Sequence, residues 1–176
     1  MVKHISTPLR DETIVSLRAG ERVLLSGDVF TARDAAHKRI TALLDKGELP
    51  PFEFDGQVVY YAGPCPAPPG RVIGSVGPTT ARRMDSYAPQ LIESGLKVMV
   101  GKGERSSAVI EAICKFGGVY LSAVGGTGAL ISQCVEKSEL VTFDDLDTEA
   151  VYRLQVRDLP LVVAIDSQGG CIYERR

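Results

Sequence analysis

The segment Gly77-Pro78-Thr79-Thr80-Ala81-Arg82-Arg83-Met84-Asp85 lies between a β-like run, residues 71–76, and a stretch with helical spacing. Glycine and proline favour a turn, so two hydroxyls and two guanidinium groups follow at the start of a helix. Unpaired backbone N–H groups and the positive end of the helix dipole favour an anion there. The same residues also suit a simple helix cap with solvated arginines. Both interpretations stay open from this segment alone.

A succession of strand, glycine turn and helix recurs along the chain. The turns are Ser26-Gly27, Gly77-Pro78, Gly101-Lys102-Gly103 and Gly125-Gly126. The chain is β-rich at first, then alternates β-α-β-α-β-α, and is β-rich again. This order predicts an α/β domain with a central, partly parallel sheet and additional strands.

Four candidate site residues follow the predicted strand ends: Arg33, Thr79, Arg83 and Lys102. Ligands of open α/β sheets bind beyond the carboxyl ends of strands, so we expect these side chains to converge on one crevice. Two arginines, a lysine and a hydroxyl would form a receptor for a small dianion, because arginine binds carboxylates bidentately and lysine adds a point charge. Phosphate would also fit.

Local patterns predict the individual elements. A helix begins near Thr31 as its N-cap, and Asp55-Gly56 forms the turn of a β-hairpin. The helix after the opening segment runs to about Ser94, and Pro89 inside it predicts a kink or two helical pieces. Further strands are expected over residues 21–27, 97–100, 119–124, 140–143, 151–156 and 161–166, and further helices over residues 107–116 and 129–134. Residues 1–20 are expected to form a leading arm.

Size and composition limit the classes of function. The 176 residues are enough for one domain, expected to span residues 1–176. A net charge of −2 argues against nucleic acid as a partner. No apolar run approaches the roughly 20 residues that span a bilayer, and the N-terminus has no secretory signal, so we expect no membrane association. The four cysteines, Cys65, Cys114, Cys134 and Cys171, are far apart, which favours reduced thiols in a cytoplasmic protein and argues against a metal site of this chain alone.

The sequence shows no motif for other common kinds of catalytic site. Residues 101–106 lack the spacing of a phosphate-binding loop, and no Ser/His/Asp set or carboxylate pair can be argued. His37 shares a helix face with Arg33, and we expect it on the surface or at the edge of the core; Asp34 and Lys38 are expected to form an i,i+4 pair. The chain thus presents anion receptors without a strong nucleophile or cofactor ligand set, which predicts half of an active site.

Three motifs in a fixed order carry a family resemblance. They are Thr31-Ala32-Arg33-Asp34-Ala35-Ala36-His37-Lys38-Arg39, the segment at residues 77–85 described above, and Gly101-Lys102-Gly103. Nearly the whole chain, from Thr7 to Asp166, resembles the β subunit, or C-terminal domain, of class I iron–sulfur fumarases and L(+)-tartrate dehydratases. The resemblance implies a swivelling β/β/α domain whose active site is completed by an α subunit. That subunit would carry a [4Fe–4S] cluster on three cysteines of its own, and no cysteine here would be a cluster ligand.

The resemblance also implies a reaction and a role for each matching residue. The family reaction is the reversible hydration of a dicarboxylate, such as fumarate to malate. By motif position, Arg33, Arg83 and Lys102 would bind the substrate carboxylates. Thr79 would be the catalytic acid/base or a relay to one. Arg82 stands where the family more often has a small residue, and it would face solvent or the α subunit.

The motifs resemble fumarases more than tartrate dehydratases. We therefore expect the β subunit of a class I fumarate hydratase, a cytoplasmic hydro-lyase that is active only with its α subunit, as an αβ heterodimer or a dimer of that pair. The β subunit of L(+)-tartrate dehydratase is the nearest alternative. A stand-alone module that binds small anions without catalysis is a further alternative.

Overall fold

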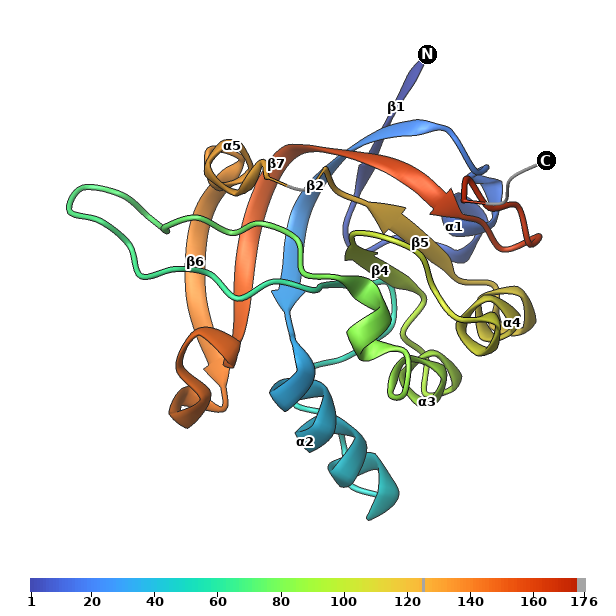
Figure 1. The fold of residues 1–176 in the computed structure, drawn as a ribbon, viewed down its shortest axis with the longest axis horizontal. Coiled ribbons are helices and arrows are strands. Elements are labelled where there is room, and N and C mark those ends of the chain that lie inside the picture. Colours follow the sequence, from blue (N-terminus) through green and yellow to red (C-terminus); the bar gives the residue numbers. More distant parts are fainter. Residues whose placement is uncertain (125, 174–176) are drawn as a thin grey trace.

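A seven-stranded mixed sheet organises the chain (Figure 1). The computed structural model describes residues 1–124 and 126–173. The described elements are β1 (Val2–Ser6), α1 (Asp11–Ser16), β2 (Arg22–Thr31), α2 (Asp34–Asp45), β3 (Val58–Tyr60), the 3-10 helix η1 (Ala81–Met84), α3 (Ala88–Glu93), β4 (Val98–Gly101), α4 (Ser107–Phe116), β5 (Val119–Ser122), α5 (Gly128–Ser132), β6 (Val135–Thr142), the 3-10 helix η2 (Asp144–Glu149) and β7 (Val151–Ile165). The predicted α/β fold with a central, partly parallel sheet is confirmed.

The pairing of the strands closes the sheet onto itself. Strands β1 to β5 are parallel neighbours in that order. The long strand β7 is antiparallel to β2, β5 and β6, so it joins the two sides of the parallel set. Because β2, β3 and β4 are parallel neighbours, their carboxyl ends lie at one edge.

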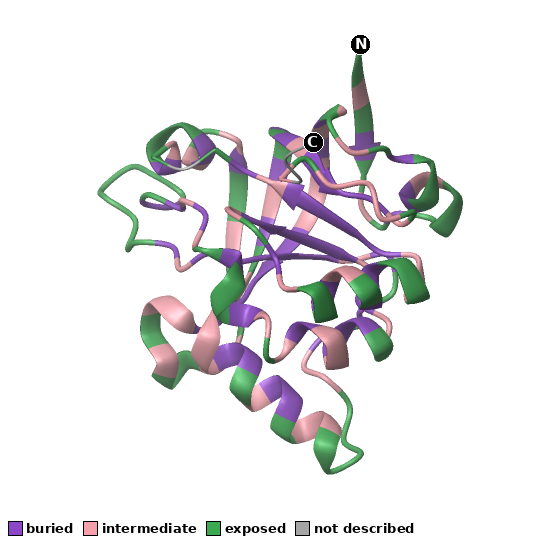
Figure 2. Ribbon diagram, turned by 45° about the vertical axis from the view of Figure 1, so that its right-hand side comes forward, coloured by how far each residue is buried: buried purple, intermediate pink, exposed green. Residues whose placement is uncertain are grey.

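Two apolar cores lie on opposite faces of the sheet. Alternate residues of a strand point to opposite faces, so Val98 and Val100 of β4 enter one core and Met99 enters the other. Helices α2, α3 and α4 cover the second core with residues such as Ile40 and Ile113. Figure 2 shows the strands at the centre as buried and the outer sides of these helices as exposed. Strands buried on both faces read as continuous apolar runs, as β3 and β4 do.

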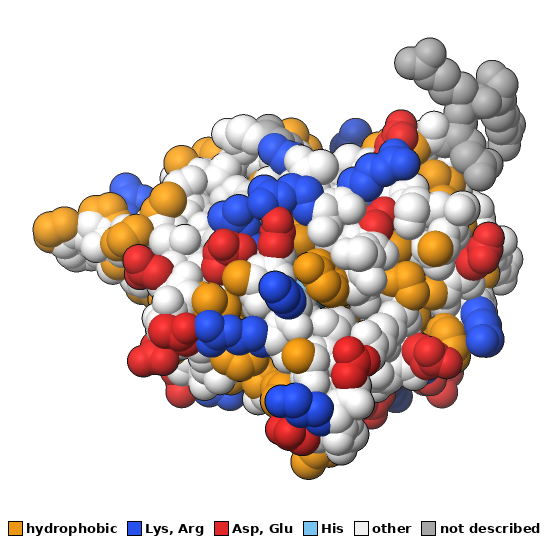
Figure 3. All heavy atoms as spheres, turned by 60° about the horizontal axis from the view of Figure 1, so that its bottom comes forward, with side chains coloured by type: hydrophobic (Ala, Val, Ile, Leu, Met, Phe, Trp, Pro, Cys, Tyr) orange, Lys and Arg blue, Asp and Glu red, His pale blue; other side chains and the backbone are white. Residues whose placement is uncertain are grey.

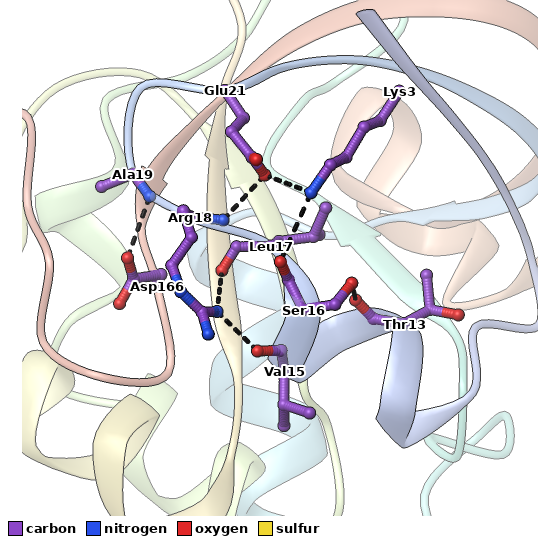
Figure 4. A network of polar contacts seen from close by, with 9 residues as sticks. All are labelled: Lys3, Thr13, Val15, Ser16, Leu17, Arg18, Ala19, Glu21 and Asp166. Carbon is purple, nitrogen blue, oxygen red and sulfur yellow. Dashed lines mark hydrogen bonds and ion pairs between the residues drawn. The ribbon is translucent and has the colours of Figure 1, made fainter.

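The first twenty residues are tied to the sheet by polar contacts (Figure 4). Lys3 Nζ donates to Glu21 Oε2 at 2.8 Å, and the Arg18 N–H donates to the same carboxylate. The Ala19 N–H donates to Asp166 Oδ2 at 2.9 Å, just beyond β7. Strand β1 pairs with β2 along its whole length. This segment therefore contributes an edge strand to the sheet.

Several local predictions are confirmed. Helix α4 has the predicted bounds, and Gly117 ends it with a positive φ of 71°. The segment after the opening turn forms two helical pieces, η1 and α3, with Pro89 in the first turn of α3. Proline is tolerated there because the N–H groups of a first turn have no partner within the helix.

Three other predictions are wrong. The Asp55-Gly56 turn does not lead into a hairpin, because β3 instead pairs in parallel with β2 and β4. Residues 71–76 are part of a long loop that returns to the body where Tyr60 Oη donates to the Val76 carbonyl at 2.6 Å. Thr31 does not cap α2; it ends β2, and its hydroxyl accepts the Tyr152 N–H at 3.1 Å.

Candidate functional site

Residues 77–85 extend the sheet by a short backbone pairing beyond the carboxyl ends of β3 and β4. The Thr79 N–H donates to the Tyr61 carbonyl at 2.6 Å, and the Lys102 N–H donates to the Thr79 carbonyl at 3.3 Å. The Ala81 N–H returns to the Lys102 carbonyl at 2.8 Å, so that Thr80 and Lys102 form a parallel bridge. This backbone pairing places Thr79 beside Lys102.

Arg33 is the N-cap residue of α2, and Arg83 of η1 reaches the first residue of the same helix. Arg83 Nη2 donates to Asp34 Oδ2 at 2.5 Å, which joins η1 to this helix. Arg33 precedes Asp34, and its Nε lies 3.8 Å from Glu149 Oε1. A Cβ on Gly63, just beyond β3, would lie only 3.1 Å from Arg33 Cδ, so a glycine leaves room for this side chain.

The structure thus brings all four predicted site residues to one edge of the sheet, in two pairs. Thr79 and Lys102 are joined by a backbone hydrogen bond, and Arg33 and Arg83 are both next to Asp34, which follows Arg33 and pairs with Arg83. In Figure 1 the green turn of η1 lies between the start of α2 and α3. The acidic neighbours of the two arginines are partly exposed, and exposed ion pairs contribute only about 0–1 kcal/mol. The roles of the four residues stay predictions.

The start of α2 has unused hydrogen-bonding capacity. Among the described residues, Arg33 Nε, Asp34 Oδ1 and His37 Nε2 are buried without a hydrogen-bond partner. Buried polar atoms nearly always bind a protein group, an ordered water or a ligand. Three such atoms within one helical turn leave capacity there for ordered water or for a polar ligand.

His37 lies fully inside the core, so the expectation of a surface or core-edge position is wrong. Its Nδ1 is 2.8 Å from the Arg33 carbonyl; a carbonyl only accepts, so Nδ1 carries the proton. Burial lowers the pKa of His37 from 6.5 to about 4, against the opposing effect of this carbonyl. His37 is therefore neutral near pH 7. The predicted pair of Asp34 with Lys38 is wrong, because Asp34 pairs with Arg83 instead.

A buried arginine beneath the site was missed by the sequence reasoning. The Arg105 side chain is fully buried, and its Nε donates to Asp85 Oδ1 at 2.7 Å. Its Nη2 donates to Tyr61 Oη at 3.2 Å, and its guanidinium also lies over the Tyr120 ring. Burial opposes its charge, but Tyr61, Asp85 and Tyr120 together raise the pKa of Arg105 above its ordinary value. Nothing in the sequence pattern distinguishes this arginine from the exposed ones.

The cysteines do not form a metal or cluster site. Cys65 and Cys114 are exposed, whereas Cys134 and Cys171 are half-buried. Burial raises the pKa of the Cys114 and Cys134 thiols, which disfavours the thiolates that bind metals. Within residues 1–124 and 126–173, no group of three His, Cys, Asp or Glu side chains could hold a metal ion. The donors present therefore do not fit an iron–sulfur cluster.

The surface is mixed in charge. On the face drawn in Figure 3, basic and acidic side chains are interspersed and do not form one continuous basic field. Exposed ion pairs such as Arg153 with Glu139 illustrate this mixture. In the part of the chain that the structure describes, no helix is both long and apolar enough to cross a membrane.

Comparison with known proteins places the chain in a family. The family model described as fumarase C-terminus matches residues 2–176. The aerobic class I fumarate hydratase of Escherichia coli is 39% identical over 156 residues, which cover 88% of this chain and 28% of the relative. Fumarate hydratase 2 of Leishmania major is 39% identical over 159 residues, covering 89% and 28% of the two chains. The putative L(+)-tartrate dehydratase subunit beta of Methanocaldococcus jannaschii is 37% identical over 172 residues, covering 94% of this chain and 88% of the relative. The chain thus spans little more than a quarter of the two fumarate hydratases.

Proposed function

This chain belongs to the fumarase C-terminus family, and from that premise we propose that it acts as the β subunit of a class I [4Fe–4S] fumarate hydratase. The observation that supports the proposal is that Arg33, Thr79, Arg83 and Lys102 all lie beyond the carboxyl ends of β2, β3 and β4, with Arg83 paired to Asp34 next to Arg33 and Thr79 bonded to Lys102 through the backbone. A hydration site for a dicarboxylate needs several cations, because both the dianion and the charge that develops on proton loss must be stabilised. The reaction is the reversible hydration of fumarate to malate.

The two pairs of residues take separate tasks in this proposal. Arg33 and Arg83 bind a substrate carboxylate after it displaces Asp34 and Glu149 from them. Lys102 binds the other carboxylate as a point charge, next to Thr79. Thr79 is the acid/base at the adjacent carbon or a relay to that group. Its backbone is held on both sides, by Tyr61 and Lys102, which fixes the hydroxyl relative to the cations.

A partner subunit completes the site in this proposal. Two of the similar fumarate hydratases are much longer chains, and this chain spans 28% of each. The relative from Methanocaldococcus jannaschii has a length close to that of this chain and is named a subunit beta. We therefore propose an α subunit as the partner, in an αβ heterodimer or a dimer of it, in the cytoplasm. The [4Fe–4S] cluster is assigned to that subunit, because the cysteines of this chain do not fit it.

A tartrate dehydratase is the second candidate. It is favoured by the Methanocaldococcus jannaschii relative, whose similarity covers 94% of this chain. L-Tartrate and malate share two carboxylates and differ by a hydroxyl, so the same four residues suit either substrate.

Reconstitution with the α subunit tests the proposal. The two subunits are co-expressed anaerobically, and kcat/KM is measured for fumarate, malate and L-tartrate. The proposal predicts turnover of fumarate and malate with a much lower value for L-tartrate. A preference for L-tartrate would replace the first candidate by the second. Anion binding by an assembled complex that turns over none of the three would favour a module without catalysis.

A further inference from the structure

We propose that Arg105 is a positioning residue whose contacts hold the backbone segments that carry Arg33, Thr79, Arg83 and Lys102 in place relative to one another. The expected effect of Arg105 on turnover rests on the proposed function. Its expected effect on local order rests only on contacts within this chain. The Arg105 guanidinium contacts Asp85 and the rings of Tyr61 and Tyr120. Its contacts lead to each of the four predicted site residues.

The first link leads to Thr79. Arg105 Nη2 donates to Tyr61 Oη at 3.2 Å, and the guanidinium carbon lies 5.1 Å from the centre of the same ring. The backbone of Tyr61 is part of the site, because its carbonyl accepts the Thr79 N–H at 2.6 Å. Arg105 therefore fixes the side chain of the residue whose main chain holds Thr79.

The second link leads to Lys102. The Arg105 guanidinium carbon lies 4.8 Å from the centre of the Tyr120 ring. Tyr120 Oη donates to the Gly103 carbonyl at 3.0 Å, one residue beyond Lys102. A Cβ on Gly101, on the other side of Lys102, would lie 2.8 Å from Tyr61 Cδ2. The two tyrosines that flank Arg105 therefore pack against both neighbours of Lys102.

The third link leads to Arg83. Arg105 Nε donates to Asp85 Oδ1 at 2.7 Å, and the Ser106 N–H donates to Asp85 Oδ2 at 2.5 Å. Both oxygens of Asp85 are thus engaged with residues at the start of α4. Asp85 follows η1, its own N–H donating to the Arg82 carbonyl at 3.2 Å. This contact anchors the helical turn that presents Arg83.

The fourth link leads to Arg33 through aromatic packing. The His37 ring meets the Tyr61 ring edge to face, with ring centres 5.3 Å apart. His37 Nδ1 donates to the Arg33 carbonyl at 2.8 Å. The Arg33 backbone is therefore connected to Tyr61, and through Tyr61 to Arg105.

The chemistry of this position requires arginine. The guanidinium donates from Nε to Asp85, lies over the Tyr61 and Tyr120 rings, and donates a further N–H to Tyr61 Oη. Lysine keeps the charge but has no planar group to stack or to donate in a fixed fork. Arg105→Lys is therefore expected to preserve the buried charge pair with Asp85 but to hold residues 77–85 and 101–106 less firmly.

Amide hydrogen exchange of the whole isolated chain tests the local claim without any partner. In Arg105→Lys, peptides that cover residues 77–85 and 101–106 are expected to exchange at least about tenfold faster, whereas peptides from β6 and from the first half of β7 keep the wild-type rate. Tyr120→Phe removes only the bond to the Gly103 carbonyl, so it is expected to speed exchange at residues 101–106 alone. Arg39→Gln is the matched control, because Arg39 pairs with Asp145 and lies over the Phe143 ring on the surface, away from these peptides.

Turnover of the assembled αβ complex tests the functional claim. Misplacement of catalytic groups by about 1 Å can cost roughly a hundredfold, so kcat/KM of Arg105→Lys is expected to fall about a hundredfold, with kcat lowered and KM raised because substrate-binding groups are displaced as well, and kcat/KM of Arg105→Gln is expected to fall further. Wild-type exchange and turnover in Arg105→Lys would overturn the inference, as would faster exchange spread evenly over the whole chain. If Arg105→Gln does not fold, Arg105→Lys and Tyr120→Phe still decide. If the wild-type complex is inert, the proposed function fails, while the exchange pattern still tests the position of Arg105.

Discussion

Acid is expected to destabilise this fold through His37, which can be measured without a partner or a substrate. Burial lowers the pKa of His37 from 6.5 to about 4 in the folded chain. Because the folded pKa lies below the unfolded one, the unfolded chain binds more protons between these values. The stability that the neutral ring contributes is therefore complete above about pH 6.5 and is lost as the pH falls towards 4.

The size of this effect follows from linkage. At about 1.4 kcal/mol per pKa unit, the full difference corresponds to roughly 3 kcal/mol. About 2 kcal/mol of it is lost between pH 7.5 and pH 5. This loss is large against a typical stability of about 5–15 kcal/mol.

Urea denaturation at about pH 7.5 and about pH 5 measures this loss. His37→Asn keeps a donor for the Arg33 carbonyl but does not titrate, so its unfolding free energy is expected to fall by about 2 kcal/mol less than that of the wild type. His4→Asn is the matched control, because it makes the same substitution at the exposed histidine of the chain. The same pH dependence in His37→Asn and wild type would refute the reasoning.

Three further predictions concern single substitutions. Arg83→Ala in the complex is expected to lower kcat/KM about tenfold to a hundredfold, which corresponds to the loss of a charge-assisted contact of about 1.5–3 kcal/mol. The control Arg82→Ala is expected to keep the wild-type kcat/KM. A loss of kcat/KM in Arg82→Ala but not in Arg83→Ala would show that Arg82 is the residue that binds substrate. Lys102→Ala is expected to lower kcat/KM by a similar factor with an unchanged melting temperature, and unchanged turnover would remove Lys102 from the site. Gly101→Ala places a Cβ 2.8 Å from Tyr61 Cδ2 and is expected to cost about 1–3 kcal/mol in urea denaturation; a stability equal to that of the wild type would contradict this packing.

The location of the candidate residues in the fold could be predicted from the sequence because it depends on a local rule. Each predicted site residue follows a strand or a glycine turn, and parallel neighbours align their carboxyl ends. This rule accounts for the placement of Arg33, Thr79, Arg83 and Lys102 beyond neighbouring strand ends, while their role as a site stays a prediction. The break between η1 and α3 was equally local, because Pro89 is a strong constraint on a helix.

The pairing of β7 could not be read in the same way. Two strands were expected, over residues 151–156 and 161–166, whereas the structure has one, β7. Asp158 has a positive φ of 51°, and the register between β2 and β7 shifts near Gly27, so a bulge absorbs the irregularity. The Asp158 N–H donates to Ser26 Oγ across this bulge at 3.0 Å. Only the partner strand supplies these contacts, and they are distant in sequence.

The burial of Arg105 and His37 also depends on distant contacts. Arginine and histidine are seldom fully buried, and a local pattern gives no reason to expect either inside the core. Their partners Asp85, Tyr61 and Tyr120 come from three separate segments. The hairpin expected around Asp55 failed for the same reason, because β3 finds its neighbours across the sheet and not next to it in the chain.

The requirement for two subunits is the most direct test of the account. Malate formation from fumarate is measured anaerobically with this chain alone, with the α subunit alone and with the two assembled. The account predicts activity for the assembled pair and none for either subunit, because the cations lie on this chain and its cysteines do not fit a cluster. Malate formation by this chain alone would contradict the shared site.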